Sequence, residues 1–198
     1  MISIIDYGAG NLRSVQNTLA ELGAKYKLIE TPEAVLAADR IILPGVGHFG
    51  QLMGSLDLLR LRQPLLEKIS AGTPYFGICL GMQALFSGSD EAPDLQGLSL
   101  YPERIERFPT TARVPHMGWN SLTPKPGSRL LAGLTDPIYV YFANSYYAPP
   151  IEATSATCEY QFPFSAVLEK DNIYGVQFHP EKSGPIGLKI MRNFLELS

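Results

Sequence analysis

Cysteine is scarce in this sequence, and so are charge clusters and long apolar runs. Cys79 and Cys158 are the only cysteines among 198 residues, and neither belongs to a C-x-x-C pair or another spacing typical of metal ligands. A small disulfide scaffold is therefore excluded, and a chain of this length can bury a substantial core without such cross-links. The scarcity of cysteine fits a reducing compartment, so we expect a cytoplasmic protein.

Charge of one sign does not dominate the chain. There are 16 Lys and Arg against 19 Asp and Glu, the formal net charge is −3, and the charged residues are dispersed. No basic stripe marks a surface for nucleic acid. Runs of 18 apolar residues are absent, and the N-terminus MISIIDYGAG lacks a basic segment followed by a long apolar one. We therefore expect neither nucleic acid nor a membrane as a partner.

The first half of the chain alternates short apolar runs with segments of helical periodicity. Leu12, Val15, Leu19 and Leu22, for example, recur at helical spacing after an apolar run that ends at Asp6. We predict strands at 2–6, 26–29 and 40–43, helices at 12–22, 32–38, 49–59 and 64–71, and a strand followed by a helix within 75–85. This alternation is typical of parallel βαβ units in an α/β fold.

The second half has a different pattern, in which strand-like runs are separated by proline and glycine. Residues 98–108, 138–148, 154–160 and 164–178 favour strands, and the last run is typical of a hairpin that turns around residues 170–172. The apolar spacing of Ile186, Ile190 and Phe194 predicts a closing helix. We expect a single domain over residues 1–198, with a mostly parallel central sheet flanked by helices and additional antiparallel strands in the second half.

The stretch FGICLG, residues 76–81, places a cysteine between a predicted strand and a predicted helix. Gly77 and Gly81 flank Cys79 two residues away on either side, and small residues there permit the sharp turn of a nucleophile elbow. The N-terminus of the following helix would stabilise a thiolate, the reactive form of the side chain. The alternative is a buried, inert cysteine, because free cysteine is among the most buried residue types.

A base for this cysteine is predicted in the stretch GVQFHPEKSG, residues 175–184. His179 follows an apolar strand, and Pro180 favours an extended backbone before it, so that Glu181 can point to the same side. Cys79 would then be the nucleophile, His179 the proton carrier and Glu181 the carboxylate that orients the imidazole. A polar loop at a strand end is the alternative interpretation of His-Pro-Glu. Two such motifs at strand ends of one α/β chain favour a catalytic site.

These motifs resemble those of the class I glutamine amidotransferases. FGICLGMQ is similar to the nucleophile motif of that class, and GVQFHPE is similar to its His-Glu motif. Further segments resemble the family of glutaminase subunits of imidazole glycerol phosphate synthase: DYGAGNLRSV at 6–15, LPGVGHFG at 43–50, VPHMGWN at 114–120 and HPEKSG at 179–184. The resemblance covers nearly the whole chain. The turn Pro44-Gly45-Val46-Gly47 favours this branch, because most of the class has a shorter Pro-Gly-Gly turn.

The resemblance implies that the chain hydrolyses L-glutamine to glutamate and ammonia without a cofactor. Cys79 would form a γ-glutamyl thioester, which water hydrolyses with His179 as the base. The backbone N–H of Leu80 and an N–H of the turn at Val46 and Gly47 would form the oxyanion hole. By similarity, the residues that contact glutamine would be Gly45, Gly47, Gln83, Ser145 and Tyr146.

The resemblance also implies a heterodimer with a (β/α)8-barrel cyclase. The cyclase uses the ammonia to make imidazole glycerol phosphate and an aminoimidazole carboxamide ribotide in histidine biosynthesis. The segments that would contact it contain Met117, Trp119, Tyr141, Asn144 and Lys182. Exposed Trp119 and Met117 would suit an interface, although both could instead be ordinary core residues. The family commonly has histidine where this chain has Asn144, which cannot titrate near neutral pH.

Three other functions stay open at this point. A glutaminase serving another synthase would share the triad but lack the Pro-Gly-Val-Gly turn and the VPHMGWN segment. A thiol hydrolase would work without a partner, and a silent scaffold would bind the cyclase without turnover. Nucleotide binding is not expected, because the segment with Gly8 and Gly10 lacks the third glycine of G-x-G-x-x-G.

Overall fold

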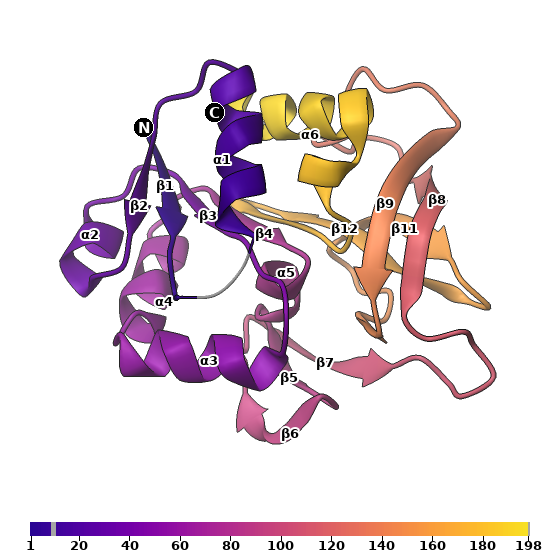
Figure 1. Ribbon diagram of the computed structural model, residues 1–198, viewed down its shortest axis with the longest axis horizontal. Coiled ribbons are helices and arrows are strands. Elements are labelled where there is room, and N and C mark those ends of the chain that lie inside the picture. The colour runs from indigo at the N-terminus through magenta and orange to yellow at the C-terminus, as the bar shows by residue number, and fades with distance from the viewer. Residues whose placement is uncertain (9–10, 198) are drawn as a thin grey trace.

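The computed structural model describes residues 1–8 and 11–197, so Gly10 of the segment above lies outside the described residues (Figure 1). The first half contains β1 (Ile2–Ile5), α1 (Leu12–Glu21), β2 (Tyr26–Ile29), α2 (Pro32–Leu36), β3 (Ile41–Leu43), α3 (Phe49–Leu58), α4 (Arg62–Ser70), β4 (Tyr75–Ile78) and α5 (Leu80–Gln83). The second half contains β5 (Phe86–Ser89), β6 (Ala92–Gln96), β7 (Tyr101–Arg107), β8 (His116–Pro124), β9 (Ile138–Asn144), β10 (Tyr146–Tyr147), β11 (Thr154–Glu159), β12 (Pro163–Lys170), β13 (Ile173–Val176), the 3-10 helix η1 (Pro180–Lys182) and α6 (Gly184–Glu196).

A nine-stranded sheet in the order β2-β1-β3-β4-β13-β12-β11-β8-β9 forms the centre of the fold. The strands from β2 to β13 in this order pair in parallel. The strands from β13 to β9 pair antiparallel. A second sheet in the order β10-β7-β5-β6 lies beside α3 and α5. The predicted α/β fold, with parallel strands first and antiparallel strands in the second half, is confirmed.

Helices cover both faces of the parallel part of the sheet, with α1 and α6 on one face and α3 and α4 on the other (Figure 1). Every residue of β1, β3 and β4 is buried, which explains why their sequences are continuous apolar runs rather than alternating ones. Phe194 of α6 stacks on Phe76 of β4, with ring centroids 4.8 Å apart. The sheet thus holds its parallel strands rigidly between two apolar layers.

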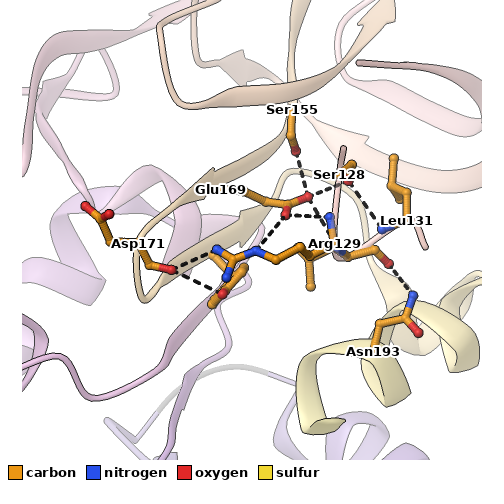
Figure 2. Close-up of polar contacts among 9 residues, drawn as sticks. Ser128, Arg129, Leu131, Ser155, Glu169, Asp171 and Asn193 are labelled. Carbon is orange, nitrogen blue, oxygen red and sulfur yellow. Dashed lines mark hydrogen bonds and ion pairs between the residues drawn. The ribbon is translucent and has the colours of Figure 1, made fainter. Parts of the chain in front are cut away.

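The buried side chain of Glu169 connects the loop between β8 and β9 to the antiparallel part of the sheet (Figure 2). The Glu169 carboxylate accepts hydrogen bonds from the Ser128 hydroxyl, from the Arg129 backbone N–H at 2.8 Å and from the Ser155 hydroxyl at 2.9 Å. From α6, the Asn193 amide donates to two carbonyls of the same loop at 2.8 and 2.9 Å. These contacts hold β12, the loop and α6 together.

The structure corrects several predicted elements. The helix expected within 75–85 has only the four residues of α5, and it is followed at once by β5. The strands β5, β6 and β8 were not predicted at all. The hairpin around residues 170–172 is confirmed, because Lys170 pairs with Ile173 across an antiparallel turn at Asp171, which has φ 53°. Among the described residues, no helix combines the length and apolarity needed to cross a bilayer.

Candidate active site

The two sequence motifs meet because β13 inserts beside β4 in the sheet. The pair is parallel, and its register places Gly175 opposite Gly77 and Val176 opposite Ile78. Both strands therefore end at the same edge, the carboxyl edge at which open α/β sheets bind ligands. Cys79 follows β4 directly and His179 lies three residues beyond the end of β13.

Cys79 occupies a sharp turn that depends on its glycine neighbours. Its backbone has φ 52° and ψ −106°, which a residue with a side chain rarely adopts. A Cβ on Gly81 would lie 1.9 Å from the Leu43 carbonyl oxygen, and one on Gly77 would lie 2.5 Å from the Gly81 oxygen. The glycines therefore let β4, α5 and the end of β3 touch through their backbones. This geometry is that of the nucleophile elbow.

His179 and Glu181 form a buried pair. Imidazole Nδ1 lies 2.8 Å from Glu181 Oε1, and the two side chains are 3% and 2% exposed. His179 has the extended backbone expected before Pro180, with φ −101° and ψ 96°, and Glu181 follows in the 3-10 turn η1. The backbone N–H of His179 also donates to the Tyr141 carbonyl at 2.9 Å, which fixes the histidine against β9.

Opposing effects act on the pKa of His179. Burial acts to lower it, but hydrogen bonds to Cys79 and Glu181 and the negative charges of both groups outweigh burial and raise the pKa from 6.5 to about 10. Both neighbours of the imidazole therefore favour its charged form.

A cavity of about 280 Å³ opens at this edge of the sheet. Cys79 is 7% exposed and faces it. The residues that line the cavity are Val46, Gly47, Cys79, Leu80, Gln83, Glu91, Ala143, Asn144, Ser145, Tyr146, His179 and Lys182. Most of the predicted glutamine contacts are thus brought together. Gly45 is the exception, because it packs beneath the lining, where a Cβ would lie 2.6 Å from the Cβ of Leu80.

Hydrogen-bonded side-chain amides connect the cavity wall to the Cys79 sulfur. Gln83 Nε2 donates to the Tyr146 carbonyl at 3.1 Å and to Gln177 Oε1 at 2.9 Å. Gln177 Nε2 in turn donates to the Cys79 sulfur at 3.5 Å. Asn144 Nδ2 donates to the same Tyr146 carbonyl at 2.9 Å. The sequence analysis missed Gln177, although it lies within the GVQFHPE motif.

Two further residues near the cavity were missed from the sequence. Glu91 lines the cavity, and its carboxylate accepts a hydrogen bond at 2.7 Å from the backbone N–H of Phe49, the first residue of α3. Tyr7 is buried after β1, and burial raises its pKa to about 12, against the opposing effect of the Val46 N–H. Glu91 belongs to none of the motifs of the sequence analysis, and Tyr7 lies in the segment DYGAGNLRSV without having been singled out there.

An exposed aromatic patch lies next to the cavity on β8 and β9. Met117 is 65% exposed and Trp119 is 58% exposed, so the core interpretation of these two residues is wrong. Trp119 pairs with Tyr141 across the strands, with ring centroids 6.2 Å apart, and Lys182 Nζ lies 5.9 Å from the Tyr141 ring. Asn144 does not share this patch. It is buried in the cavity wall.

The geometry agrees with comparisons to known proteins. The family model for glutamine amidotransferase class-I matches residues 3–197, so the chain belongs to that class. Two solved structures under 25% identical share the fold: a glutamine amidotransferase (18% identity, TM-score 0.78, 98% of this chain and 97% of that chain) and PurLQS from Thermotoga maritima (16% identity, TM-score 0.75, 98% and 96%).

Closer relatives define the branch of this class. The imidazole glycerol phosphate synthase subunit HisH of Desulfitobacterium hafniense is 47% identical over 196 residues, which cover 98% of this chain and 93% of the relative. The HisH subunit of Methanothermobacter thermautotrophicus is 48% identical over 198 residues, which cover 100% and 98%. The chain therefore belongs to the family of HisH subunits of imidazole glycerol phosphate synthase.

Proposed function

We propose that the chain is the glutaminase subunit of an imidazole glycerol phosphate synthase, which acts in histidine biosynthesis. It hydrolyses L-glutamine with a triad of Cys79, His179 and Glu181 and passes the ammonia to a cyclase. The observation that carries this proposal is the strained turn that presents Cys79 to the same cavity as the buried His179–Glu181 pair. An inert core cysteine would have no reason to occupy such a turn.

The protonation state of the pair fits the order of the chemical steps. The Cys79 thiolate attacks the carboxamide carbon of glutamine, and the imidazolium of His179 gives its proton to the departing nitrogen. Ammonia leaves and a γ-glutamyl thioester remains. His179 is now neutral and can accept a proton from the water that attacks the thioester. Glutamate leaves, and the thiolate and imidazolium are restored.

The oxyanion of each tetrahedral intermediate needs donors beside the sulfur. Leu80 is the first residue of α5, and the first N–H groups of a helix lack partners inside the helix. A second donor would come from the turn at Val46 and Gly47, which also lines the cavity. Gly47 has φ 105°, a conformation open mainly to glycine, so this peptide can rotate more easily than others. Such donors supply much of the rate enhancement in acyl transfer.

The cavity also provides groups that would recognise the ends of glutamine. The two amide hydrogens of Gln83 are used in its bonds to Tyr146 and Gln177, so the side chain can offer a ligand only its carbonyl oxygen. That oxygen would accept a hydrogen bond from the substrate. The Glu91 carboxylate adds negative charge for the α-ammonium group. Ser145 and Tyr146 complete the wall beside them.

The aromatic patch would receive the (β/α)8-barrel cyclase in a cytoplasmic heterodimer with glutaminase and lyase activities. Tryptophan, tyrosine and methionine are enriched at the centre of protein interfaces. The patch lies beside η1, whose Lys182 both contacts Tyr141 and lines the cavity. Ammonia released at Cys79 therefore has a short path to a partner seated there.

The test is to measure glutamate release at saturating glutamine by the chain alone, with the cyclase, and with the cyclase plus its nucleotide ligand. We expect weak activity alone and strong activation in the third mixture, because a partner that binds the competent conformer more tightly shifts the population toward it. Equal turnover in all three mixtures would support a partner-independent hydrolase. A lack of glutamate in every mixture would refute the glutaminase assignment.

A further inference from the structure

We propose that Gln177 is a further catalytic residue, which donates a hydrogen bond to the nucleophilic sulfur of Cys79. Gln83 is the positioning residue that fixes the direction of this donor. The inference deepens the proposed function and rests on it, because it assigns Cys79 as the nucleophile. Gln177 is completely buried, directly after β13, so its amide must make its hydrogen bonds inside the site.

The orientation of both amides follows from one backbone carbonyl. The Tyr146 oxygen can only accept, so the end of the Gln83 side chain that faces it at 3.1 Å is the NH2 group. The second hydrogen of this group points to Gln177, 2.9 Å away, and requires an acceptor there. Gln177 must therefore turn its carbonyl oxygen to Gln83 and its own NH2 group to the Cys79 sulfur, at 3.5 Å.

This direction matters for the chemistry of the sulfur. A glutamine amide free to rotate could present its oxygen, and an acceptor facing a thiolate is repulsive. A fixed N–H donor instead favours the charged form of the sulfur and holds it in one place. Gln177 comes directly after β13, and His179 follows two residues later, just before η1.

Several ionisable groups face the sulfur and would contribute to its titration. His179 lines the same cavity as the sulfur, with Glu181 paired to its imidazole, and Tyr7 lies near the sulfur beyond the end of β1. Glu91 and Lys182 line the same cavity. Gln177 carries no charge at any pH, so replacing it by methionine alters the titration without adding or removing a titrating group.

The experiment measures the rate of Cys79 alkylation by iodoacetamide across pH, in the full-length chain with Cys158→Ala so that a single thiol remains. We expect Gln177→Met, which keeps the length but removes the donor, to raise the midpoint of the alkylation profile by about one pH unit. At pH values below the midpoint the rate falls about tenfold. Gln177→Glu, which has the same shape and adds an anion, should raise the midpoint further.

Two other variants separate this role from simple loss of a buried amide. Gln83→Met leaves Gln177 in place but releases its orientation, so the midpoint should rise in the same direction by a smaller amount. Asn193→Leu removes a buried amide that bonds only to the loop carbonyls, so it should lower the melting temperature and leave the profile unchanged. Circular dichroism establishes which variants are folded.

The proposal is overturned if the folded Gln177 variants keep the wild-type midpoint, or if Asn193→Leu shifts it equally. Should both Gln177 variants fail to fold, an unshifted midpoint in Gln83→Met overturns it. Failure of the proposed function is a different result, because it is the absence of glutamate release by the unmodified chain with its cyclase. Alkylation needs neither glutamine nor the partner, so the two outcomes are independent.

Discussion

Replacing Glu181 by glutamine tests how much the triad depends on a buried charge. The carboxylate lies 2.8 Å from imidazole Nδ1, and the side chains are 3% and 2% exposed, so solvent hardly screens the bond. A hydrogen bond to a charged group contributes about 1.5–3 kcal/mol. Its loss should lower the glutaminase rate by about ten- to a hundredfold, because His179 is an imidazolium when each tetrahedral intermediate forms.

The same change should alter the pH dependence in a defined direction. The pKa of His179 is raised to about 10, and loss of the carboxylate should lower it by roughly one to two units. A raised pKa stabilises the fold fully below the unfolded value of 6.5, and this stability is lost as pH rises toward 10. In Glu181→Gln, the free energy of unfolding should therefore fall less between these two pH values than in the wild type.

The first assay measures glutamate release by the complex of the chain with the cyclase and its nucleotide ligand, from about pH 6 to about pH 10. The second measures urea unfolding of the chain alone over the same pH range. Glu169→Gln is a matched control, because it neutralises another buried carboxylate that contacts only the loop and neighbouring strands (Figure 2). It should destabilise the fold without changing the activity profile. A Glu181→Gln rate within twofold of wild type, with an unchanged profile, would refute the role of this carboxylate.

Three further predictions concern single side chains. Cys79→Ala should abolish the glutamate release that the cyclase and its ligand stimulate, with the fold intact by circular dichroism, whereas Cys158→Ala should retain this activity. Substantial partner-dependent release by Cys79→Ala would show that this sulfur is not the nucleophile. Trp119→Ala should weaken cyclase binding by roughly 2 kcal/mol in titration calorimetry and leave the melting temperature near wild type, since the ring is 58% exposed. Gly81→Ala should lower the free energy of unfolding in urea by about 1–3 kcal/mol or more, because the new Cβ would lie 1.9 Å from the Leu43 carbonyl oxygen. An unchanged free energy of unfolding would contradict the close backbone packing around the Cys79 turn.

The predictable parts of the fold are those in which local pattern and tertiary environment agree. Strands β1, β3 and β4 are buried throughout and appear as apolar runs, and α1 and α6 show their buried faces at helical spacing. The missed strands lack this agreement. β6 is mostly exposed and is held by pairing with β5, and β8 exposes Met117 and Trp119 where a strand on a monomer surface would carry polar residues.

The candidate site shows a similar division. Cys79, His179 and Glu181 lie in short motifs whose residue types and spacing are typical of a nucleophile and its base, so the sequence could predict that they lie close together. Gln177 lies inside the GVQFHPE motif, but its residue type does not indicate a role, and only the pairing of β13 with β4 brings it to the Cys79 sulfur. Glu91 lies in no motif, and it reaches the cavity because it follows β5. The extended backbone predicted for His179 is confirmed, but the 3-10 turn η1 that follows it and carries Glu181 was not predicted.

The position of Tyr141 links the aromatic patch to the chemistry of the site. Its ring faces Trp119 and Lys182 on the surface, while its carbonyl accepts the hydrogen bond of the His179 backbone N–H at 2.9 Å. A partner that moved β9 by a few tenths of an ångström would therefore move the histidine relative to the sulfur. Asn144 lies on the same strand and bonds to the Tyr146 carbonyl, from which the amide chain to Cys79 begins. One strand thus contacts both His179 and the amide chain, so a partner that bound to β9 would act on both without a separate regulatory domain.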